Sequence, residues 1–257
     1  MATHSDWAMA ASAQLFRAYA FLARGEMAGE RREAASVGTA VFDDEVPLRL
    51  DSNFLRVEQD AEPETVLQEA RRLNRRMIHV EDPEVGDRIA PFFAERRWLV
   101  RRHIVMAQLR EPERNGDAGF VEEVGEKELR PARHRVVTGQ PWGTPEVMAQ
   151  LFAGKQLIAR RVQTRFFALK VGGEVASYTD LYQDGADAQI EDVGTVQEHR
   201  CRGYASTVVL AAIDVARRNG AEFVFLVADR DDWPKELYRR LGFDELGYYV
   251  KLIAPHT

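Results

Sequence analysis

The sequence predicts an α/β protein in two parts, residues 1–118 and residues 119–257. Predicted strands and helices alternate along the first part, which is typical of an α/β domain. In the second part, two helical regions are followed by three strands joined by tight turns, and then by a helix, a strand, a short helix and a last strand. The polar segment 110–119, which contains Pro112, Asn115-Gly116 and Gly119, is the predicted linker.

The elements of the first part follow from apolar periodicity and from helix start and stop signals. The segment 62–76 has Pro63 near its start, apolar residues at helical spacing and basic residues at its end, which together predict a helix. Asp82 and Pro83 open a second helix, and Pro91 is expected to kink or divide it. In order, the first part is predicted to contain helices within 7–34, strands at 39–44 and 52–59, a helix at 62–76, a strand at 77–80, a helix at 82–97 and a strand at 98–109.

The second part is marked by two glycine turns. Gly172-Gly173 and Asp184-Gly185 are each flanked by β-branched or aromatic residues, so they predict hairpins that join three antiparallel strands within 164–196. The remaining predicted elements are a strand at 120–124, an interrupted helix at 125–137, a helix at 144–162, a helix at 204–220, a buried strand at 222–228, a short helix at 231–243 and a closing strand at 247–253.

Composition limits the classes of function. Apolar residues make up 45% and charged residues 30% of the 257 residues, a normal balance for a globular protein. No apolar run approaches the roughly 18 to 20 residues of a membrane span, and no membrane association is expected. The net charge of −6 is shared by both parts, so nucleic acid is not expected as the main partner. The histidines lack the spacing of metal ligands, so no metal is expected. A single cysteine and an N-terminus without a basic leader predict a cytoplasmic protein.

The junction between the strand that ends near residue 196 and the helix that starts near residue 204 carries the clearest chemical signal. It reads HRCRGYAS over residues 199–206. The first N–H groups of a helix have no helical partners, and together with the helix dipole they attract an anion. Gly203 and Ala205 keep the main chain accessible. Arg200 and Arg202 add positive charge, and Ser206 adds a hydroxyl. The stretch predicts a phosphate or pyrophosphate site, with a solvated Arg-Gly turn as the alternative.

The wider pattern around this junction resembles a known family. Predicted antiparallel strands lead into Arg-x-x-Gly-x-Ala over residues 200–205, and a helix, a buried strand and a short helix with Leu237-Tyr238 and Leu241-Gly242-Phe243 follow. This order resembles the GNAT superfamily of acetyl-CoA-dependent N-acetyltransferases over residues 119–257. The resemblance implies a mixed, mostly antiparallel sheet flanked by helices. Because residues 92–109 echo residues 237–253, the first part is expected to be a smaller, degenerate GNAT-like half in a tandem arrangement.

The resemblance also implies which residues hold acetyl-CoA. The strand before the junction would pair with the pantetheine arm, and the loop would surround the pyrophosphate. Cys201 stands where glycine is more common, and the loop accommodates it if its φ is negative. Asp231 stands where many members have an asparagine that contacts the CoA arm. The expected acetyl-CoA-binding residues are Thr195, Val196, Arg200, Cys201, Arg202, Gly203, Tyr204, Ala205, Ser206 and Asp231.

Three residues are candidates for catalysis. Tyr238 matches the tyrosine proposed as general acid in this family, and its alternative role is packing between helix and sheet. Some members place a catalytic glutamate eleven residues before the first position of the loop, which is Gln189 here. Glu191 lies two residues further along on the same face of the predicted strand, so it is favoured over Asp192 as general base. Either carboxylate could instead pair with an arginine or bind the substrate amine.

We therefore expect an N-acetyltransferase that moves an acetyl group from acetyl-CoA to a primary amine of a small molecule or peptide. The alternative is a non-catalytic acyl-CoA-binding sensor or regulatory module, and an acyl group longer than acetyl is a third reading. The arginine-rich stretch 130–165 suggests an acidic acceptor or, alternatively, a solvated helix face. The first part would cover one side of the active cleft or support a homodimer.

Overall fold

The computed structural model describes residues 4–25, 27–113, 120–138 and 143–255. The chain forms two compact units. The first unit comprises Met1–Val105, Ala228–Asp232 and Leu246–Thr257, and the second comprises Met106–Val227 and Trp233–Glu245. The predicted linker 110–119 lies partly outside the described residues, and the boundary expected between residues 118 and 119 stays a prediction.

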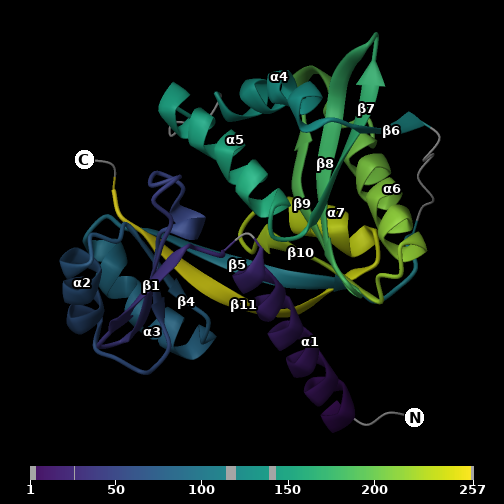
Figure 1. Ribbon diagram of the computed structural model, residues 1–257. Coiled ribbons are helices and arrows are strands. Elements are labelled where there is room, and N and C mark those ends of the chain that lie inside the picture. Colours follow the sequence, from purple (N-terminus) through teal and green to yellow (C-terminus); the bar gives the residue numbers. More distant parts are fainter. Residues whose placement is uncertain (1–3, 26, 114–119, 139–142, 256–257) are drawn as a thin grey trace. The chain divides into compact units, whose positions relative to one another are not determined.

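The first unit begins with a long helix and continues as alternating strands and helices. Its elements are α1 (His4–Arg24), β1 (Arg31–Ala35), β2 (Gly38–Phe42), β3 (Leu55–Val57), α2 (Pro63–Arg72), β4 (Met77–Val80), α3 (Pro83–Glu95), most of β5 (Leu99–Gln108) and the end of β11 (Phe243–Ile253). The helical region predicted within 7–34 is correct only up to Arg24, because Arg31–Ala35 form β1. The strand order β1-β2-β3-β4-β11 contains antiparallel neighbours except for β3 and β4, which are parallel (Figure 1).

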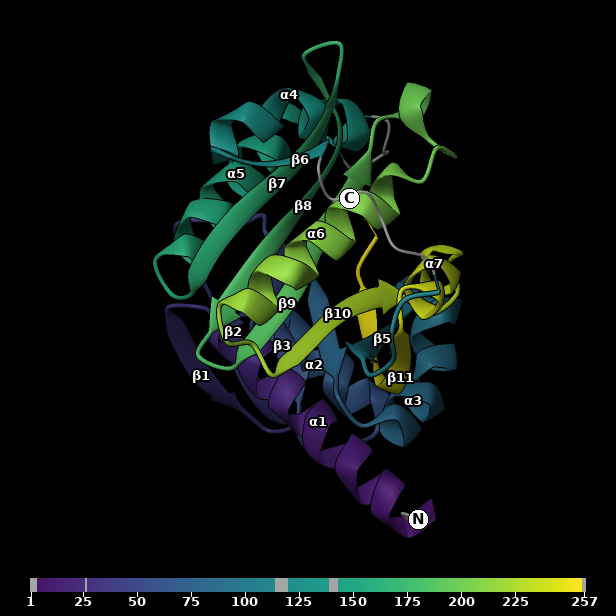
Figure 2. The same cartoon turned by 90° about the vertical axis from the view of Figure 1, so that its right-hand side faces the viewer.

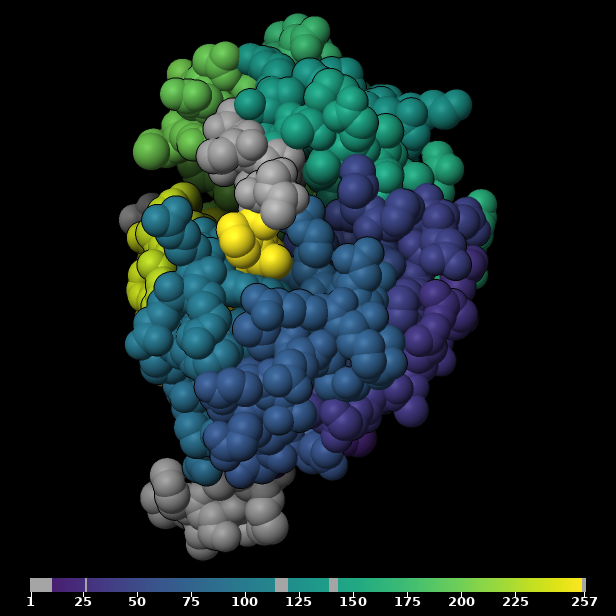
Figure 3. Space-filling view, turned by 90° about the vertical axis from the view of Figure 1, so that its left-hand side faces the viewer, coloured from purple at the N-terminus to yellow at the C-terminus, as the bar shows by residue number. Residues whose placement is uncertain are grey.

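Helices α2 and α3 cover one face of this sheet because their apolar residues recur at helical spacing. Val66 of α2 and Ile89 and Phe93 of α3 are buried in one core with Ile78 and Val80 of β4. Burying such side chains contributes about 1.5–3 kcal/mol each, so this core is the main source of stability of the unit. Figure 3 looks onto the outer surface of these two helices, which is shown in blue.

Helix α3 starts as the sequence predicts. The side chain of Asp82 accepts hydrogen bonds from the main-chain N–H groups of Glu84 at 2.8 Å and Val85 at 3.3 Å. Of the two effects expected from Pro91, division of the helix does not occur, because α3 is continuous to Glu95. The proline removes one helical hydrogen bond, and the buried apolar residues on both sides of it offset that loss.

The second unit holds the predicted hairpins. Its elements are β6 (Val121–Val124), α4 (Glu126–Val137), α5 (Pro145–Ala159), β7 (Gln163–Val171), β8 (Glu174–Asp184), β9 (Asp187–Thr195), α6 (Tyr204–Arg218), most of β10 (Phe223–Asp229), α7 (Pro234–Arg240) and the start of β11. The strand order is β10-β9-β8-β7-β6, and only β9 and β10 among these neighbours are parallel. Gly172, Gly173 and Gly185 all have positive φ, as the two tight turns require. The helix 125–137, which was expected to be interrupted, continues through Pro131 as α4.

Helices cover both faces of the second sheet. Leu129 and Ala132 of α4 pack with Tyr178 and Val196 on one face, and α5 lies along the same side in Figures 1 and 2. Val208 of α6 packs on the other face. The sheet is therefore mixed, mostly antiparallel and flanked by helices, as the resemblance implied.

The two units repeat one connectivity. In the first unit, antiparallel β1, β2 and β3 lead through α2 to β4, which is parallel to β3. In the second unit, antiparallel β7, β8 and β9 lead through α6 to β10, which is parallel to β9. The loop before α2 carries Asp60 and Glu62, whose negative charge opposes anion binding, whereas the loop before α6 carries arginines. The structure thus agrees with a tandem arrangement in which only the second unit keeps an anion-binding loop.

Candidate active site

The site is built where β9 and β10 separate. Their parallel pairing runs from the pair Phe223 and Asp187 to the pair Leu226 and Ile190, although β9 continues to Thr195. Among the described residues, none of β10 pairs with residues 191–195 of β9. A strand edge without partners inside a sheet leaves main-chain N–H and C=O groups ready for hydrogen bonds from a ligand.

A β-bulge lies at the same point of β9. Tyr178 of β8 is opposite Gly194, and Asp180 is opposite Glu191, so Thr179 faces two residues of β9. Asp192 takes the left-handed conformation, with φ of 51°. A bulge inserts one residue and breaks the simple alternation of side chains. Glu191 and Asp192, although consecutive, both lie on the face of the sheet that α4 and α5 cover.

Glu191 shares its face with Gln189, as predicted. Gln189 Nε2 donates a hydrogen bond of 2.9 Å to Glu191 Oε2. Glu191 is opposite Asp180, and cross-strand partners point to the same side of a sheet. Asp180 contacts Arg133 of α4, which identifies that side.

Asp192 lies on this face too, and its carboxylate forms ion pairs. Arg133 Nε is 2.8 Å and Lys155 Nζ of α5 is 3.2 Å from Asp192 Oδ2. The expectation that alternation would separate Asp192 from Glu191 is therefore wrong, because the bulge turns Asp192 back to the face of Glu191. One alternative role for these carboxylates was an ion pair with an arginine, and Asp192 forms such a pair with Arg133. Glu191 stays the better candidate for a general base.

Tyr238 of α7 is brought to the same site. Its side chain is 8% exposed, and its ring packs edge-on against Phe243 at a centroid distance of 6.2 Å. Burial raises the pKa of Tyr238 well above its usual value, and the negative charge of Glu191 raises that pKa further. The phenol is therefore protonated at neutral pH and can donate a hydrogen bond. No described residue accepts one from it.

The loop predicted to hold a phosphate leads directly into α6. The helix follows a 3₁₀ turn at Gln197–His199 and has Gly203 as its N-cap, with φ of 81°. The first helical hydrogen bond runs from Thr207 N to Gly203 O at 3.2 Å. No described residue accepts a hydrogen bond from the preceding N–H groups, which belong to Tyr204, Ala205 and Ser206. Three unpaired N–H donors together with a helix dipole are the arrangement that attracts an anion, and the anion site itself stays a prediction.

Two glycine-like conformations shape this loop. Cys201 has φ of 61°, so the expectation of a negative φ at this position is wrong. Left-handed residues at 201 and 203 turn the chain sharply between the 3₁₀ turn and α6. No atom lies within 4 Å of the place that a Cβ at Gly203 would occupy, so the loop is open there.

Some of the other residues predicted to bind acetyl-CoA contact the protein itself, and others are exposed to solvent. Arg200 Nε donates to Thr195 O at 3.2 Å, and Thr195 Oγ1 is 3.0 Å from Ser177 Oγ. Val196 is buried in the core against α4, so its side chain anchors the start of the loop to that core. Arg202 is exposed and has no ion-pair partner among the residues that the structure describes.

Asp231 lies in the segment Ala228–Asp232, which belongs to the first unit. There its main-chain N–H donates to Asp229 Oδ1 at 2.9 Å. Its predicted contact with the CoA arm stays a prediction.

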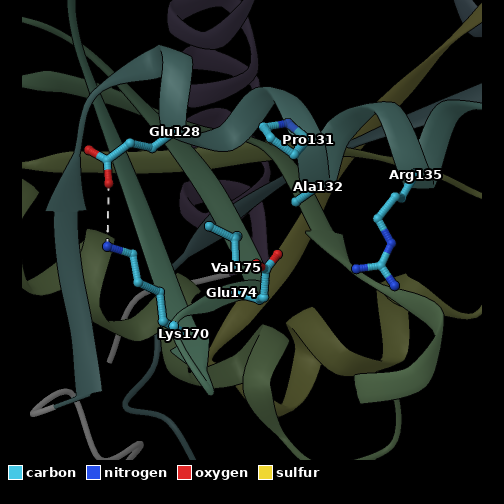
Figure 4. A pocket seen from close by; sticks show the side chains of 8 residues that line it. Glu128, Pro131, Ala132, Arg135, Lys170, Glu174 and Val175 are labelled. Carbon is cyan, nitrogen blue, oxygen red and sulfur yellow. Dashed lines mark hydrogen bonds and ion pairs between the residues drawn. The ribbon is translucent and has the colours of Figure 1, made fainter.

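A pocket of about 250 Å³ lies elsewhere in the second unit, between α4 and the turn from β7 to β8 (Figure 4). Lys170 points across it to Glu128 at 3.3 Å and also pairs with Glu122 at 2.9 Å. None of the predicted site residues lines this pocket. Both cations of its lining are paired, Lys170 with Glu122 and Glu128 and Arg135 with Glu198, so the pocket gives no sign of an anion site.

Within the described part of the chain, no group of three or more His, Cys, Asp or Glu side chains could hold a metal ion. No helix in that part has the length and apolar character needed to cross a membrane.

Part of the chain matches a known family. Residues 130–243, which lie mostly in the second unit, match the family model described as Acetyltransferase (GNAT) family. This matched region is named the GNAT domain. No curated protein matches the chain at a significant level.

Solved structures extend the likeness beyond the GNAT domain. A GCN5-related N-acetyltransferase from Kribbella flavida is 19% identical over 97% of this chain and 96% of that chain, with a TM-score of 0.59. A functionally unknown conserved protein from Staphylococcus epidermidis is 14% identical over 90% and 96%, with a TM-score of 0.65. A tandem GNAT protein from the clavulanic acid biosynthesis pathway is 14% identical over 90% and 86%, with a TM-score of 0.52. At such identities the likeness shows the fold, and it covers both units of the chain.

The GNAT domain also contains polar residues that the sequence did not single out. Arg133, Lys155 and Asp180 are buried or nearly so and contact Asp192 or one another. One signal was available, since Asp180 lies between tyrosines and apolar residues in a strand predicted to be covered, and a buried carboxylate requires partners.

Gly194 is needed where Tyr178 crosses β9. A Cβ added at Gly194 would overlap the phenol ring of Tyr178, which is 1% exposed. We expect Gly194→Ala to lower the free energy of unfolding by about 1–3 kcal/mol, the usual cost of overpacking. Urea unfolding of a double-mutant cycle with Tyr178→Leu measures the effect. The cost of Gly194→Ala should fall once the ring is removed, and additive effects would contradict the overlap.

Proposed function

We propose that the GNAT domain transfers an acetyl group from acetyl-CoA to a primary amine of a small molecule or peptide. The observation that carries this proposal is the separation of β9 from β10 beyond Ile190, directly before the open N-terminus of α6. One element offers an unpaired main-chain edge and the other offers unpaired N–H donors. A ligand with an amide-containing arm and a pyrophosphate needs both.

The residues present fit the parts of acetyl-CoA. The pyrophosphate would be held by the N–H groups of Tyr204, Ala205 and Ser206, with Arg202 as a nearby free cation. Gly203 leaves the main chain open because nothing occupies the place of its missing Cβ. The edge of residues 191–195 would pair with the amides of the pantetheine arm.

Glu191 and Tyr238 supply the proton transfers of the proposed reaction. The bound ammonium would first lose a proton to Glu191, directly or through water, and the neutral amine nitrogen would then attack the thioester carbonyl carbon. The carbon–sulfur bond would break, and the second proton lost by the nitrogen balances the proton taken up by the departing thiolate, so that CoA leaves as a thiol. Tyr238 is protonated, and it would donate to the departing sulfur as negative charge develops there. Its raised pKa lies above the value of about 8.5 typical of a thiol, so hydrogen-bond donation is the main part of this role.

The charges around Glu191 favour a cationic amine over an acidic acceptor. Of the arginines in the stretch 130–165, Arg130 pairs with Glu126, Arg135 with Glu198 and Arg165 with Glu123. Arg133 forms ion pairs with Asp180 and Asp192. The stretch therefore offers no unpaired basic patch from these residues, and Glu191 adds a negative charge. An ammonium group is the acceptor charge that this face attracts.

Thermal unfolding with and without acetyl-CoA tests the proposal. Ligand at about 100 times its Kd should add roughly 2.7 kcal/mol of stability, seen as a rise in Tm. Gly203→Glu should abolish the rise, because it puts a side chain and a negative charge into the open loop at a left-handed φ. The matched control Glu222→Gln, an exposed site in the same unit, should keep the full rise.

No rise at millimolar acetyl-CoA would contradict the proposal. A rise with desulfo or acyl-free CoA that equals the rise with acetyl-CoA, but without turnover of any amine in a thiol-release assay, would instead favour the sensor reading. The sensor stays an alternative because a loop that binds CoA does not by itself require catalysis.

A further inference from the structure

The bulge in β9 needs a cause. Asp192 adopts φ of 51°, a conformation that is unfavourable for a residue with a Cβ, although aspartate and asparagine tolerate it better than most. The bulge also decides where β9 points beyond Ile190, since the pairing with β10 stops there. Something in the structure must hold Asp192 in this conformation.

A cluster of charges, defined here as Arg133, Lys155, Asp180 and Asp192, surrounds the bulge. Arg133 Nε is 2.8 Å from Asp192 Oδ2, and its Nη2 pairs with Asp180 Oδ1. Lys155 Nζ is 2.8 Å from Asp180 Oδ2 and 3.2 Å from Asp192 Oδ2. Each cation thus contacts both carboxylates. Tyr182 Oη completes the shell by donating to Asp180 Oδ2 at 3.0 Å.

Burial makes this cluster stiff. The side chain of Asp180 is 0% exposed and that of Arg133 is 4% exposed, whereas Asp192 is 31% exposed. The Arg133 guanidinium also lies over the rings of Phe166 and Tyr178, at 5.4 and 5.5 Å from their centroids. Buried ion pairs with several partners fix one geometry, because any departure leaves a charge without compensation. The cluster therefore ties α4, α5 and β8 to the bulge of β9.

The bulge stands between the two parts of the proposed site. The candidate base Glu191 precedes Asp192 directly, and the unpaired edge of β9 follows it. We propose that Asp192 is a positioning residue: held by Arg133 and Lys155, it fixes the bulge and thereby the Glu191 carboxylate and the β9 edge that receives acetyl-CoA. This inference rests on the proposed function for its consequence in binding and catalysis.

Two substitutions separate charge from backbone conformation. Asp192→Asn keeps a residue that tolerates positive φ but removes the charge, and Asp192→Gly removes the side chain while permitting the same φ. If conformation alone mattered, both variants would behave like the wild type. If the ion pairs hold the bulge, both lose the anchor. Asp214→Asn on α6 is the matched control, because it is the same substitution at an exposed pair with Arg218 that includes no residue of the cluster.

Hydrogen exchange of the whole chain is the first measurement. In Asp192→Asn, amides in a peptide covering residues 187–196 should exchange about tenfold faster, with peptides from β6 and β7 unchanged. Asp214→Asn should leave both regions unchanged. Equal exchange of residues 187–196 in wild type and Asp192→Asn would overturn the inference. Faster exchange throughout the sheet of the second unit would overturn it too, since it would show general loss of stability.

Ligand binding and turnover are the second measurement. Asp192→Asn should raise the Kd for acetyl-CoA about fivefold and lower kcat about tenfold at a temperature where the variant is fully folded. Unchanged Kd and kcat together with a lower Tm would show a purely structural role and overturn the inference. If wild-type protein itself binds no acetyl-CoA, the proposed function fails, and hydrogen exchange alone still decides whether Asp192 holds the bulge.

Discussion

Glu191→Gln is expected to lower kcat by a factor of about 100 or more, the usual contribution of a positioned general base. The amide of glutamine cannot accept the proton of the attacking amine. It does preserve the size of the side chain, and it keeps an oxygen that can accept the hydrogen bond from Gln189. The Kd for acetyl-CoA should change less than about threefold, because the main-chain edge of β9 is unaltered.

The measurement combines calorimetric titration of acetyl-CoA with thiol release in the presence of a panel of primary amines. Glu222→Gln, the same substitution at an exposed site, is the control and should keep wild-type kcat. A Glu191→Gln variant with undiminished turnover would remove Glu191 from the mechanism. A large rise in Kd without a change in kcat would assign it to binding instead.

Asp180→Asn is expected to destabilise the second unit strongly, with a loss of about 3–5 kcal/mol in the free energy of unfolding. Asp180 is 0% exposed and contacts both Arg133 and Lys155. Removing its charge leaves two buried cations that Asp192, and Glu126 at 4.0 Å from Arg133 Nη1, compensate less completely. A loss of this size is a large part of the 5–15 kcal/mol by which domains are usually stable.

Urea unfolding followed by tyrosine and tryptophan fluorescence measures this loss, with separate fits if the two units unfold in separate steps. Asp214→Asn, which breaks an exposed pair with Arg218 on α6, is the control and should cost less than about 0.5 kcal/mol. If Asp180→Asn is as stable as the wild type, the charge cluster contributes nothing to the fold.

Local signals in the sequence predict most elements of the second unit. The turns at Gly172-Gly173 and Asp184-Gly185 need positive φ, and only glycine reaches it without strain, so β7, β8 and β9 were predictable. The loop from Arg200 to Ala205 and the motif around Tyr238 indicate the GNAT domain, because both lie within a few residues of a helix end. The helix start at Asp82 is equally local, and its side chain forms the N-cap of α3.

Features that depend on distant partners were not predictable. Alternation along a strand places Glu191 and Asp192 on opposite faces, and only the pairing with β8 reveals the bulge that brings them together. Arg133 and Lys155 read as residues of solvated helices until the fold sets them against Asp180.

The sequence by itself determined the kind of candidate site: a helix start predicted to bind an anion, a strand with a candidate base and a tyrosine at a short helix. These depend on residue types at fixed local spacing. Only the tertiary structure decided that Asp192 is paired with Arg133 and Lys155. It also decided that the end of the last strand, with Val250 and Leu252, joins the core of the first unit. The reason is that strand pairing and burial join residues far apart in the chain, and no local pattern specifies their partners.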